Sequence, residues 1–367
     1  MTELLRRVEP IGLDASSRAD EIESLRRLPD DLAHALVGTG IFRAWVPTVY
    51  GGDGADAMTV LDAIEALSFH DGSTGWCAAI GATTSLTAAF LPPEFALEIF
   101  GDPLAVTGGF AMPAGRGVPV DGGIVVNGLW QWGSGTSHCT WIGGGCIVEG
   151  AGAPFVFFER DQVELLDTWR VAGLKGTGST DYTVTDAFVP EGRWVHVLKA
   201  EPVVDGPLYR MPFMGLLALG VCMVTLGLAR RAQHELVELA GGKKPSGSSK
   251  TLAERQVVQA EVARTEAAWR SAHALIREVV EEATEIGVTD EMRRRIRLAA
   301  TDATWRSAEA VDRMYHAGGG SAIHESHPLQ RVFRDVHVAT QHGMVAERTY
   351  EPVGRMALGL PTDASQL

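Results

Sequence analysis

Apolar residues recur at helical spacing through the first part of the chain. Leu28, Leu32 and Leu36 follow one another at intervals of about one helical turn, which places their side chains on one face of a helix. The glycine-rich run PTVYGGDGAD (residues 47–56) interrupts the pattern and is typical of a turn. We therefore predict a helical N-terminal domain over residues 1–102.

Two segments are apolar or small at nearly every position. DGSTGWCAAIGATTSLTAAF (71–90) has no polar face, so we expect a helix buried on all sides, whose residues 76–90 line a substrate pocket. FMGLLALGVCMVTLGLA (213–229) is at the short limit for a membrane span and contains several glycines. Because it continues directly into the amphipathic RRAQHELVEL, we predict a buried helix at the centre of a bundle.

Short runs of Val, Ile, Phe and Trp separated by glycine replace the helical pattern near Pro103. VDGGIVVNGLWQW and TWIGGGCIVEGAGAPFVFFE are examples, and both are typical of strands joined by tight turns. The helical period returns in long segments further along, with Thr289 or Asp290 as a helix cap. We predict a compact β-domain over residues 103–200 and a helical bundle over residues 201–367.

The charge of the chain excludes several kinds of partner. Its 367 residues carry a formal net charge of −14, with a sequence pI near 5.3. A chain this acidic has no electrostatic attraction to a nucleic acid backbone or to an anionic membrane. We therefore expect neither nucleic acid nor a membrane as a partner.

The cysteine pattern is typical of a reduced, cytoplasmic protein. None of the four cysteines stands in a CxxC pair, which disfavours a zinc knuckle or a redox dithiol. The N-terminus MTELLRRVEPIGLD lacks the apolar core of a signal peptide. His324 and His337 have no recurring spacing with a carboxylate, so we expect no metal site.

Four motifs in series resemble the acyl-CoA dehydrogenase superfamily, and the order helical domain, β-domain, bundle matches that superfamily over almost the whole chain. The resemblance implies a mostly helical α+β fold with an N-terminal helical domain, a central β-barrel-like domain and a C-terminal four-helix bundle. The motifs are PTVYGG (47–52), DGSTGW (71–76), GLKGTGSTDYTVTDAFVP (173–190) and the run from AGGGSAI to HPLQRVFRD (317–335).

Members of this superfamily use bound flavin in two ways. Dehydrogenases hold FAD and desaturate a CoA thioester, with a glutamate as the base. The two-component (group D) monooxygenase branch takes reduced flavin from a separate reductase and uses oxygen to hydroxylate an aromatic or related substrate. Since the cofactor carries the difficult chemistry in both, the protein residues must distinguish them.

The expected dehydrogenase base is missing here. Where the straight-chain dehydrogenases have it, this chain has Gln341, His342 and Gly343, and Glu351 comes two helical turns too late. Some dehydrogenases carry the glutamate on an earlier helix, so the absence favours the monooxygenase branch without deciding for it. His342 could deprotonate a phenol or hold a peroxide oxygen. It could also be a helix-face histidine satisfied by backbone or water.

The segment that holds the FAD diphosphate in the dehydrogenases also departs from their pattern. GKKPSGSSKTLAERQ (242–256) lacks their arginine and their Phe-Gly pair. Its Ser, Gly and Lys residues could still bind a phosphate at the start of the helix. This favours a flavin that is bound and exchanged as a substrate, and leaves FMN or FAD open.

SGTSHC (134–139) resembles the loop of the monooxygenase branch in which a serine lies by the flavin N5. A hydrogen bond there slows loss of hydrogen peroxide from the flavin hydroperoxide. The resemblance thus implies Ser134 as the first site residue, with Gly135 beside it and with Trp132 and His138 flanking the ring or substrate. The alternative is a β-turn in which Ser134 caps backbone groups and the tryptophans fill the core.

Two further glycine-containing segments correspond to cofactor contacts of the superfamily. GTGSTD (176–181) implies that Thr177, Gly178 and Ser179 face the flavin. Gly318 and Gly319 correspond to a glycine pair that contacts the cofactor across a subunit interface. Each segment is equally compatible with an ordinary tight turn.

The sequence thus predicts a flavin-dependent monooxygenase that hydroxylates an aromatic or polycyclic small molecule through a flavin hydroperoxide. Its cofactor is reduced flavin (FMN or FAD), its partner is a flavin reductase, and it forms a homo-oligomer, a tetramer through the bundle. Ser134, His342 and His138 are the predicted catalytic residues. The alternatives are an FAD-bound acyl-CoA dehydrogenase-type desaturase and a non-catalytic, ligand-binding member of the fold.

Overall fold

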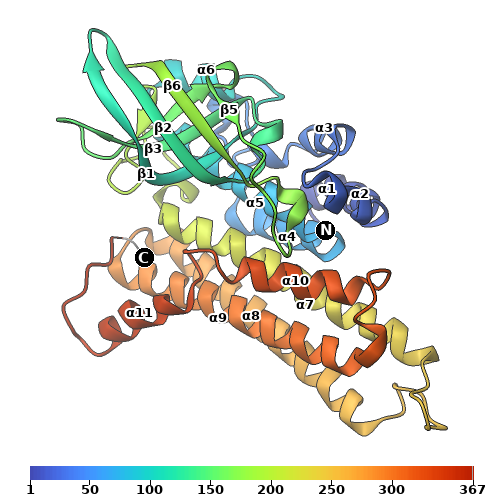
Figure 1. Ribbon diagram of the computed structural model, residues 1–367. Helices are drawn as coiled ribbons and strands as arrows, with labels where there is room; N and C mark the ends of the chain where they lie inside the picture. The colour runs from blue at the N-terminus through green and yellow to red at the C-terminus, as the bar shows by residue number, and fades with distance from the viewer. Residues whose placement is uncertain (366) are drawn as a thin grey trace.

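The structure is a computed structural model that describes residues 1–365 and residue 367 (Figure 1). Helices come first, strands follow, and long helices complete the chain. Figure 1 shows the sheet at one end of the molecule, the long helices at the other, and α4 and α5 between them. The first helices are α1 (Glu3–Ser17), α2 (Ala19–Leu25), α3 (Asp30–Gly38), α4 (Ala57–His70), α5 (Gly72–Ser85) and α6 (Pro93–Phe100).

Every residue of α5 is buried, as its uniformly apolar and small composition predicts. The helix begins at Asp71, whose carboxylate accepts a hydrogen bond from the backbone N–H of Thr74 at 2.7 Å. Gly75 lets α4 approach closely, because a side chain there would overlap Ser68. The helix therefore brings Trp76 and Cys77 to the underside of the β-domain.

The strands form one mixed sheet in the order β5-β6-β2-β1-β3-β4-β7. β1 and β3 run parallel, and the other neighbours are antiparallel. Trp130 and Tyr182 stack within the domain, with ring centroids 5.3 Å apart, so Trp130 fills the core. The strands are β1 (Thr107–Val120), β2 (Gly123–Gly133), β3 (Trp141–Val148), β4 (Phe155–Glu159), β5 (Glu164–Leu165), β6 (Thr180–Pro190) and β7 (Trp194–Val195).

Helix α7 (Phe213–Gly242) runs through the centre of the C-terminal region. It is long and apolar enough to cross a membrane, yet 83% of its apolar window is buried inside the protein. It packs against α4, α5, α9 and α10, which confirms the predicted buried helix. Its apolar surface is therefore used in the core. The other helices of the region are α8 (Gln256–Ile286), α9 (Asp290–Gly318), α10 (Pro328–Ala339) and α11 (Tyr350–Ala357).

The start of α9 and the end of α10 test two predictions from the sequence. Thr289 caps α9 by accepting a hydrogen bond from the backbone N–H of Met292, so the predicted cap is confirmed. α10 ends at Ala339, and His342 lies in the turn that follows. His342 is therefore not on a helix face, although its Nδ1 atom is satisfied by the backbone, as that interpretation expected.

Candidate active site

Two loops of the β-domain meet where α5 passes beneath the sheet. One follows β2 and contains Ser134 and Gly135, and the other precedes β6 and contains Thr177 to Ser179. The backbone N–H of Gly135 donates to the Thr177 carbonyl at 2.9 Å. Gly135 and Gly178 both have positive φ, 70° and 55°, which glycine adopts without strain. The two loops predicted to face one ligand are thus held together.

Three hydroxyl groups gather at this junction. The Ser134 and Ser179 oxygens are 2.6 Å apart, and the Ser179 and Thr177 oxygens are 2.7 Å apart. All three side chains are buried. The structure therefore brings together the predicted polar residues Ser134, Thr177 and Ser179 as one hydrogen-bonded cluster.

Trp76 extends this cluster toward the bundle. Its indole N–H donates to the Ser134 hydroxyl at 3.0 Å, and only 7% of Trp76 is exposed. The DGSTGW motif pointed to Trp76 as a pocket residue, yet nothing in the sequence indicated a bond to Ser134. Because an indole N–H only donates, Ser134 must be the acceptor in this bond.

His342 lies on the other side of Trp76. The two rings make an edge contact, with centroids 5.4 Å apart and planes at 74°. The Nδ1 atom of His342 accepts a hydrogen bond from the backbone N–H of Met344 at 3.3 Å. Burial, assisted by the nearby Arg297 charge, lowers the His342 pKa to about 4. The ring is therefore neutral near pH 7, with its hydrogen on Nε2.

His138 has different neighbours. Its ring packs against Phe42, with centroids 5.5 Å apart. The ring also lies against Gly135, where an added side-chain carbon would be 3.1 Å from it. Burial lowers the pKa of His138 to about 4, and among the described residues its Nδ1 atom has no hydrogen-bond partner. A buried polar atom without a partner is costly, so a bound molecule that donates a hydrogen bond to it would be stabilised. The two histidines thus have different neighbours. His342 contacts Trp76, whereas His138 contacts Phe42 and lies beside Gly135.

Trp132 lies at the edge of the cluster. Its φ of 60° is unusual for a non-glycine residue, and 56% of the side chain is exposed. The ring makes an edge contact with Phe110, with centroids 5.5 Å apart. Trp132 therefore presents an aromatic surface next to Ser134, unlike Trp130 in the core.

Gly318 and Gly319 lie elsewhere in the chain's own fold, at the end of α9. The Gly318 carbonyl accepts a hydrogen bond from the Lys243 ammonium at 2.6 Å, and a side chain at Gly318 would meet Leu329. These contacts belong to the bundle. The structure of one chain does not bring this pair to the Ser134 cluster.

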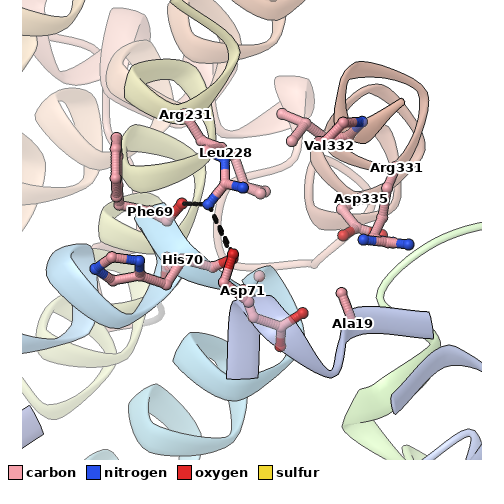
Figure 2. Close-up of a pocket in the computed structure, with 13 residues that line it drawn as sticks. Ala19, Phe69, His70, Asp71, Leu228, Arg231, Arg331, Val332 and Asp335 are labelled. Carbon is pink, nitrogen blue, oxygen red and sulfur yellow. Dashed lines mark hydrogen bonds between the residues drawn. The ribbon is translucent and has the colours of Figure 1, made fainter. Parts of the chain in front are cut away.

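A small cavity of about 50 Å³ lies between α10, α7 and the start of α5 (Figure 2). Asp71 and Asp335 line it, and both are buried. Burial raises the pKa of Asp335 to about 7 and also raises that of Asp71. Both residues belong to motifs of the sequence, Asp71 to DGSTGW and Asp335 to HPLQRVFRD, but nothing in these motifs indicated that the two carboxyl groups line one cavity.

Among the residues that the structure describes, one group of side chains has the composition of a metal site. Ligand atoms of Asp62, Glu65 and His273 lie within 4.8 Å of one another. Arg277 and Arg230 already pair with the two carboxylates, at 3.2 Å and 2.8 Å. The hydrogen bonds that His273 donates to the Asp62 and Glu65 carboxylates raise its pKa to about 9, so its ring is protonated near pH 7 and does not ligate. The arrangement is that of an ion-pair network between α4 and the bundle.

The residues present fit a flat, partly polar ring such as that of a flavin. An exposed indole, three hydroxyl groups and an imidazole nitrogen that has no partner among the described residues surround the junction of the two loops. The turn after α10 places His342 at the cluster, and Glu351, the nearest match to the dehydrogenase base, is exposed on α11. The cluster thus offers a flat ring several hydrogen-bonding groups.

Comparisons with known proteins agree with this arrangement. Residues 219–347 match the family "Acyl-CoA dehydrogenase, C-terminal domain". The chain is 32% identical to the indole-3-acetate monooxygenase of Pseudomonas putida, over 95% of this chain and 92% of that protein. It is also 32% identical to HsaA of Mycobacterium tuberculosis, the oxygenase subunit of a flavin-dependent monooxygenase, over 98% of this chain and 96% of the relative.

A solved structure supports the same relationship. XiaF from Streptomyces sp., in complex with FADH2 and glycerol, superimposes with a TM-score of 0.91 at 26% identity. The match covers 98% of this chain and 96% of that one. Reduced flavin is therefore bound by a protein of this fold and length.

Proposed function

The chain belongs to the flavin-dependent monooxygenases of the acyl-CoA dehydrogenase superfamily, and on this premise we propose that it hydroxylates a small aromatic molecule. It acts as the oxygenase component, and a separate reductase supplies its reduced flavin. The observation that carries the proposal is the Ser134 hydroxyl, which Trp76 and Ser179 hold in one position. Groups fixed in this way lose little entropy when a ligand binds.

The cluster has two tasks in this proposal. Reduced flavin, when bound, supplies the electrons that activate oxygen. Ser134, Thr177 and Ser179 would hold the polar edge of the ring, Gly135 and Gly178 would allow the backbone to approach it, and Trp132 would cover it. The buried walls exclude water, which favours transfer of oxygen to the substrate over release of hydrogen peroxide.

His342 is proposed as a hydrogen-bond donor toward the reacting oxygen. Its Nδ1 atom is occupied by the Met344 N–H, so the neutral ring presents Nε2–H. A group in this state holds an oxygen atom more readily than it removes a proton. His138, whose Nδ1 atom has no partner in the described part of the chain, is proposed to accept a hydrogen bond from flavin or substrate.

The proposed substrate is a compact aromatic ring. The residues of α5 that follow Trp76 are mostly small and apolar, among them Ala78, Ala79 and Ala82, and apolar surfaces of this kind suit an aromatic ring. The Pseudomonas putida relative is named for indole-3-acetate, an aromatic acid. We therefore propose an aromatic or fused-ring small molecule.

We further propose a homotetramer assembled through the C-terminal bundle, in which Gly318 and Gly319 contact flavin bound in a neighbouring copy. The glycines lie at the end of α9, where they carry no side chain that would block a ligand. Sedimentation of the protein with and without flavin tests the assembly. A stable monomer that retains activity would contradict it.

The function is tested with the purified chain, chemically reduced FMN or FAD, isotopically labelled oxygen and a panel of aromatic acceptors. We expect one labelled oxygen atom in the product. A protein that arrives with tightly bound FAD and bleaches anaerobically with an acyl-CoA would establish the desaturase instead. Oxidation of reduced flavin at the rate seen without protein, and with no labelled product, would indicate a non-catalytic member.

A further inference from the structure

The hydroxyl cluster is one part of a longer chain of hydrogen bonds. The chain begins at the Trp76 indole and passes through Ser134, Ser179 and Thr177. It ends at the backbone carbonyl of Leu174, which accepts from the Thr177 hydroxyl at 2.9 Å. Its two ends have fixed roles, because an indole N–H only donates and a carbonyl oxygen only accepts.

These two ends determine the direction of every bond between them. The single hydrogen of Thr177 is given to Leu174, so Ser179 must donate to Thr177. The single hydrogen of Ser179 is then used, so Ser134 must donate to Ser179. Ser134 has no further hydrogen to offer a ligand, and it keeps one lone pair that Trp76 does not use.

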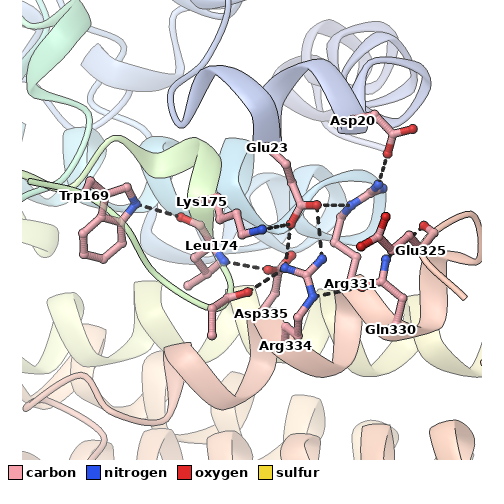
Figure 3. A network of polar contacts seen from close by, with 11 residues as sticks. Asp20, Glu23, Trp169, Leu174, Lys175, Glu325, Gln330, Arg331, Arg334 and Asp335 are labelled. Atoms are coloured by element: carbon pink, nitrogen blue, oxygen red, sulfur yellow. Dashed lines mark hydrogen bonds and ion pairs between the residues drawn. The ribbon is translucent and has the colours of Figure 1, made fainter. Parts of the chain in front are cut away.

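The Leu174 end of the chain is firmly held (Figure 3). The backbone N–H of Leu174 donates to the buried Asp335 carboxyl at 2.6 Å, and Trp169 donates to the Leu174 carbonyl at 3.3 Å. Leu174 has a positive φ of 50°, which is strained for a leucine and persists only where neighbours enforce it. The carbonyl is therefore fixed as the terminal acceptor.

The preceding backbone rests directly on α10. A side chain at Gly173 would overlap the backbone of Arg334, and the Arg334 guanidinium donates to the Ala172 carbonyl at 2.6 Å. Beside the same loop, Glu23 forms ion pairs with Lys175, Arg334 and Arg331 (Figure 3). The loop cannot turn its Leu174 carbonyl away without breaking these contacts.

We propose that this directed chain fixes Ser134 as a hydrogen-bond acceptor toward the ligand and so makes the site select reduced over oxidised flavin. Reduced flavin carries a hydrogen on N5, which can donate to the free lone pair of Ser134. Oxidised flavin has only a lone pair at N5, which would face the lone pair of Ser134. The inference rests on the proposed function, because it requires Ser134 to meet the N5 edge of a flavin.

The residue that sets the selection is then Thr177, although Ser134 makes the contact. Without the Thr177 oxygen, the hydrogen of Ser179 is free to point at Ser134. Ser134 can then turn its own hydrogen toward the ligand and bind the N5 of oxidised flavin. Loss of the Thr177 hydroxyl should therefore improve binding of the oxidised form relative to the reduced form.

The test compares the dissociation constants of oxidised and anaerobically reduced FMN and FAD for the wild type, Thr177→Val and Thr177→Ser. Valine keeps the shape of threonine without the hydroxyl, and serine keeps the hydroxyl. We expect the ratio of oxidised to reduced dissociation constants to fall about tenfold in Thr177→Val, which corresponds to about 1.4 kcal/mol. The ratio should stay near the wild-type value in Thr177→Ser.

Ser179→Ala provides a second test that does not depend on the folding of Thr177→Val. It frees the Ser134 hydrogen directly, so its ratio should fall in the same direction. Near-ultraviolet circular dichroism and thermal unfolding establish that each variant is folded. If folded Ser179→Ala and Thr177→Val both keep the wild-type ratio, the directed chain does not set selection. A wild type that binds neither form of flavin would overturn the proposed function itself.

Discussion

The indole N–H of Trp76 donates a hydrogen bond to the hydroxyl of Ser134 across 3.0 Å. This bond joins the helix beneath the β-domain to the loop after β2, and both partners are buried. The bond holds the Ser134 oxygen in one position for a given conformation of the loop backbone. The residue that orients the proposed flavin contact is therefore contributed by the N-terminal helical region.

Replacing Trp76 with phenylalanine should remove this orientation while keeping an aromatic ring next to His342. We expect hydrogen peroxide released per reduced flavin to rise several-fold, and stability to fall by about 1 kcal/mol, the usual worth of one hydrogen bond. Peroxide is measured with a coupled peroxidase. Trp269→Phe is the control, since it loses an indole bond to Gln233 in the bundle and should leave the peroxide yield unchanged.

His342→Gln and His342→Ala separate donation from proton removal. Glutamine can still donate a hydrogen bond, so product per reduced flavin should fall about tenfold more in the alanine variant, the effect of about 1.4 kcal/mol. Equal losses in the two variants would argue for proton removal by the imidazole. Because the His342 pKa is lowered to about 4, product yield should show no step near pH 6.5 that depends on this residue.

The pH dependence of stability reports on Asp335. Its pKa in the folded protein is raised to about 7 from an ordinary value of 3.8, so the folded state binds the extra proton between these values. Ionisation of Asp335 therefore lowers the stability of the wild type as pH rises through this window, by at most about 1.4 kcal/mol per pH unit.

Asp335→Asn should remove this slope, since an asparagine does not titrate and its oxygen can still accept from Leu174. Urea unfolding at several pH values between 4 and 8 measures it. We expect the wild type to lose stability relative to the variant as pH rises. Parallel curves would show that Asp335 titrates at the same pH in the folded and unfolded protein.

Gly173→Ala tests whether the loop must rest on α10. The added methyl group would overlap the Arg334 backbone, so we expect a loss of about 1–3 kcal/mol in stability and weaker flavin binding. Thermal unfolding and flavin titration measure both. Gly354→Ala on α11 is the matched control, because a methyl group there meets nothing within 4 Å and should be tolerated.

Local patterns and long-range contacts were not equally predictable. The uniformly small composition of residues 71–90 predicts a buried helix because burial depends on composition alone. The bonds that join Trp76 to Ser134 and Leu174 to Asp335 depend on tertiary packing between distant segments, which no period in the sequence encodes. The neutral tautomer of His342 follows from a turn whose geometry the sequence did not indicate.

The gathering of Ser134, Thr177 and Ser179 was predictable only through the resemblance to a flavin-dependent superfamily. Their loops read alone as ordinary Gly/Ser turns, and two such turns have no reason to meet. The contribution of Gly318 and Gly319 requires a second copy of the chain. Their predicted role therefore stays a prediction about the assembly.

The most direct test of the central claim is a single-turnover oxidation of reduced flavin by the wild type and by Ser134→Ala, with an accepted aromatic substrate present. Hydroxylated product and hydrogen peroxide are measured from the same reaction. The wild type should channel most of its reducing equivalents into product. The variant should release about five to ten times more peroxide, as expected for one lost hydrogen bond of about 1 kcal/mol. Equal product and peroxide in the two proteins would contradict the role of Ser134, and with it this account of the site.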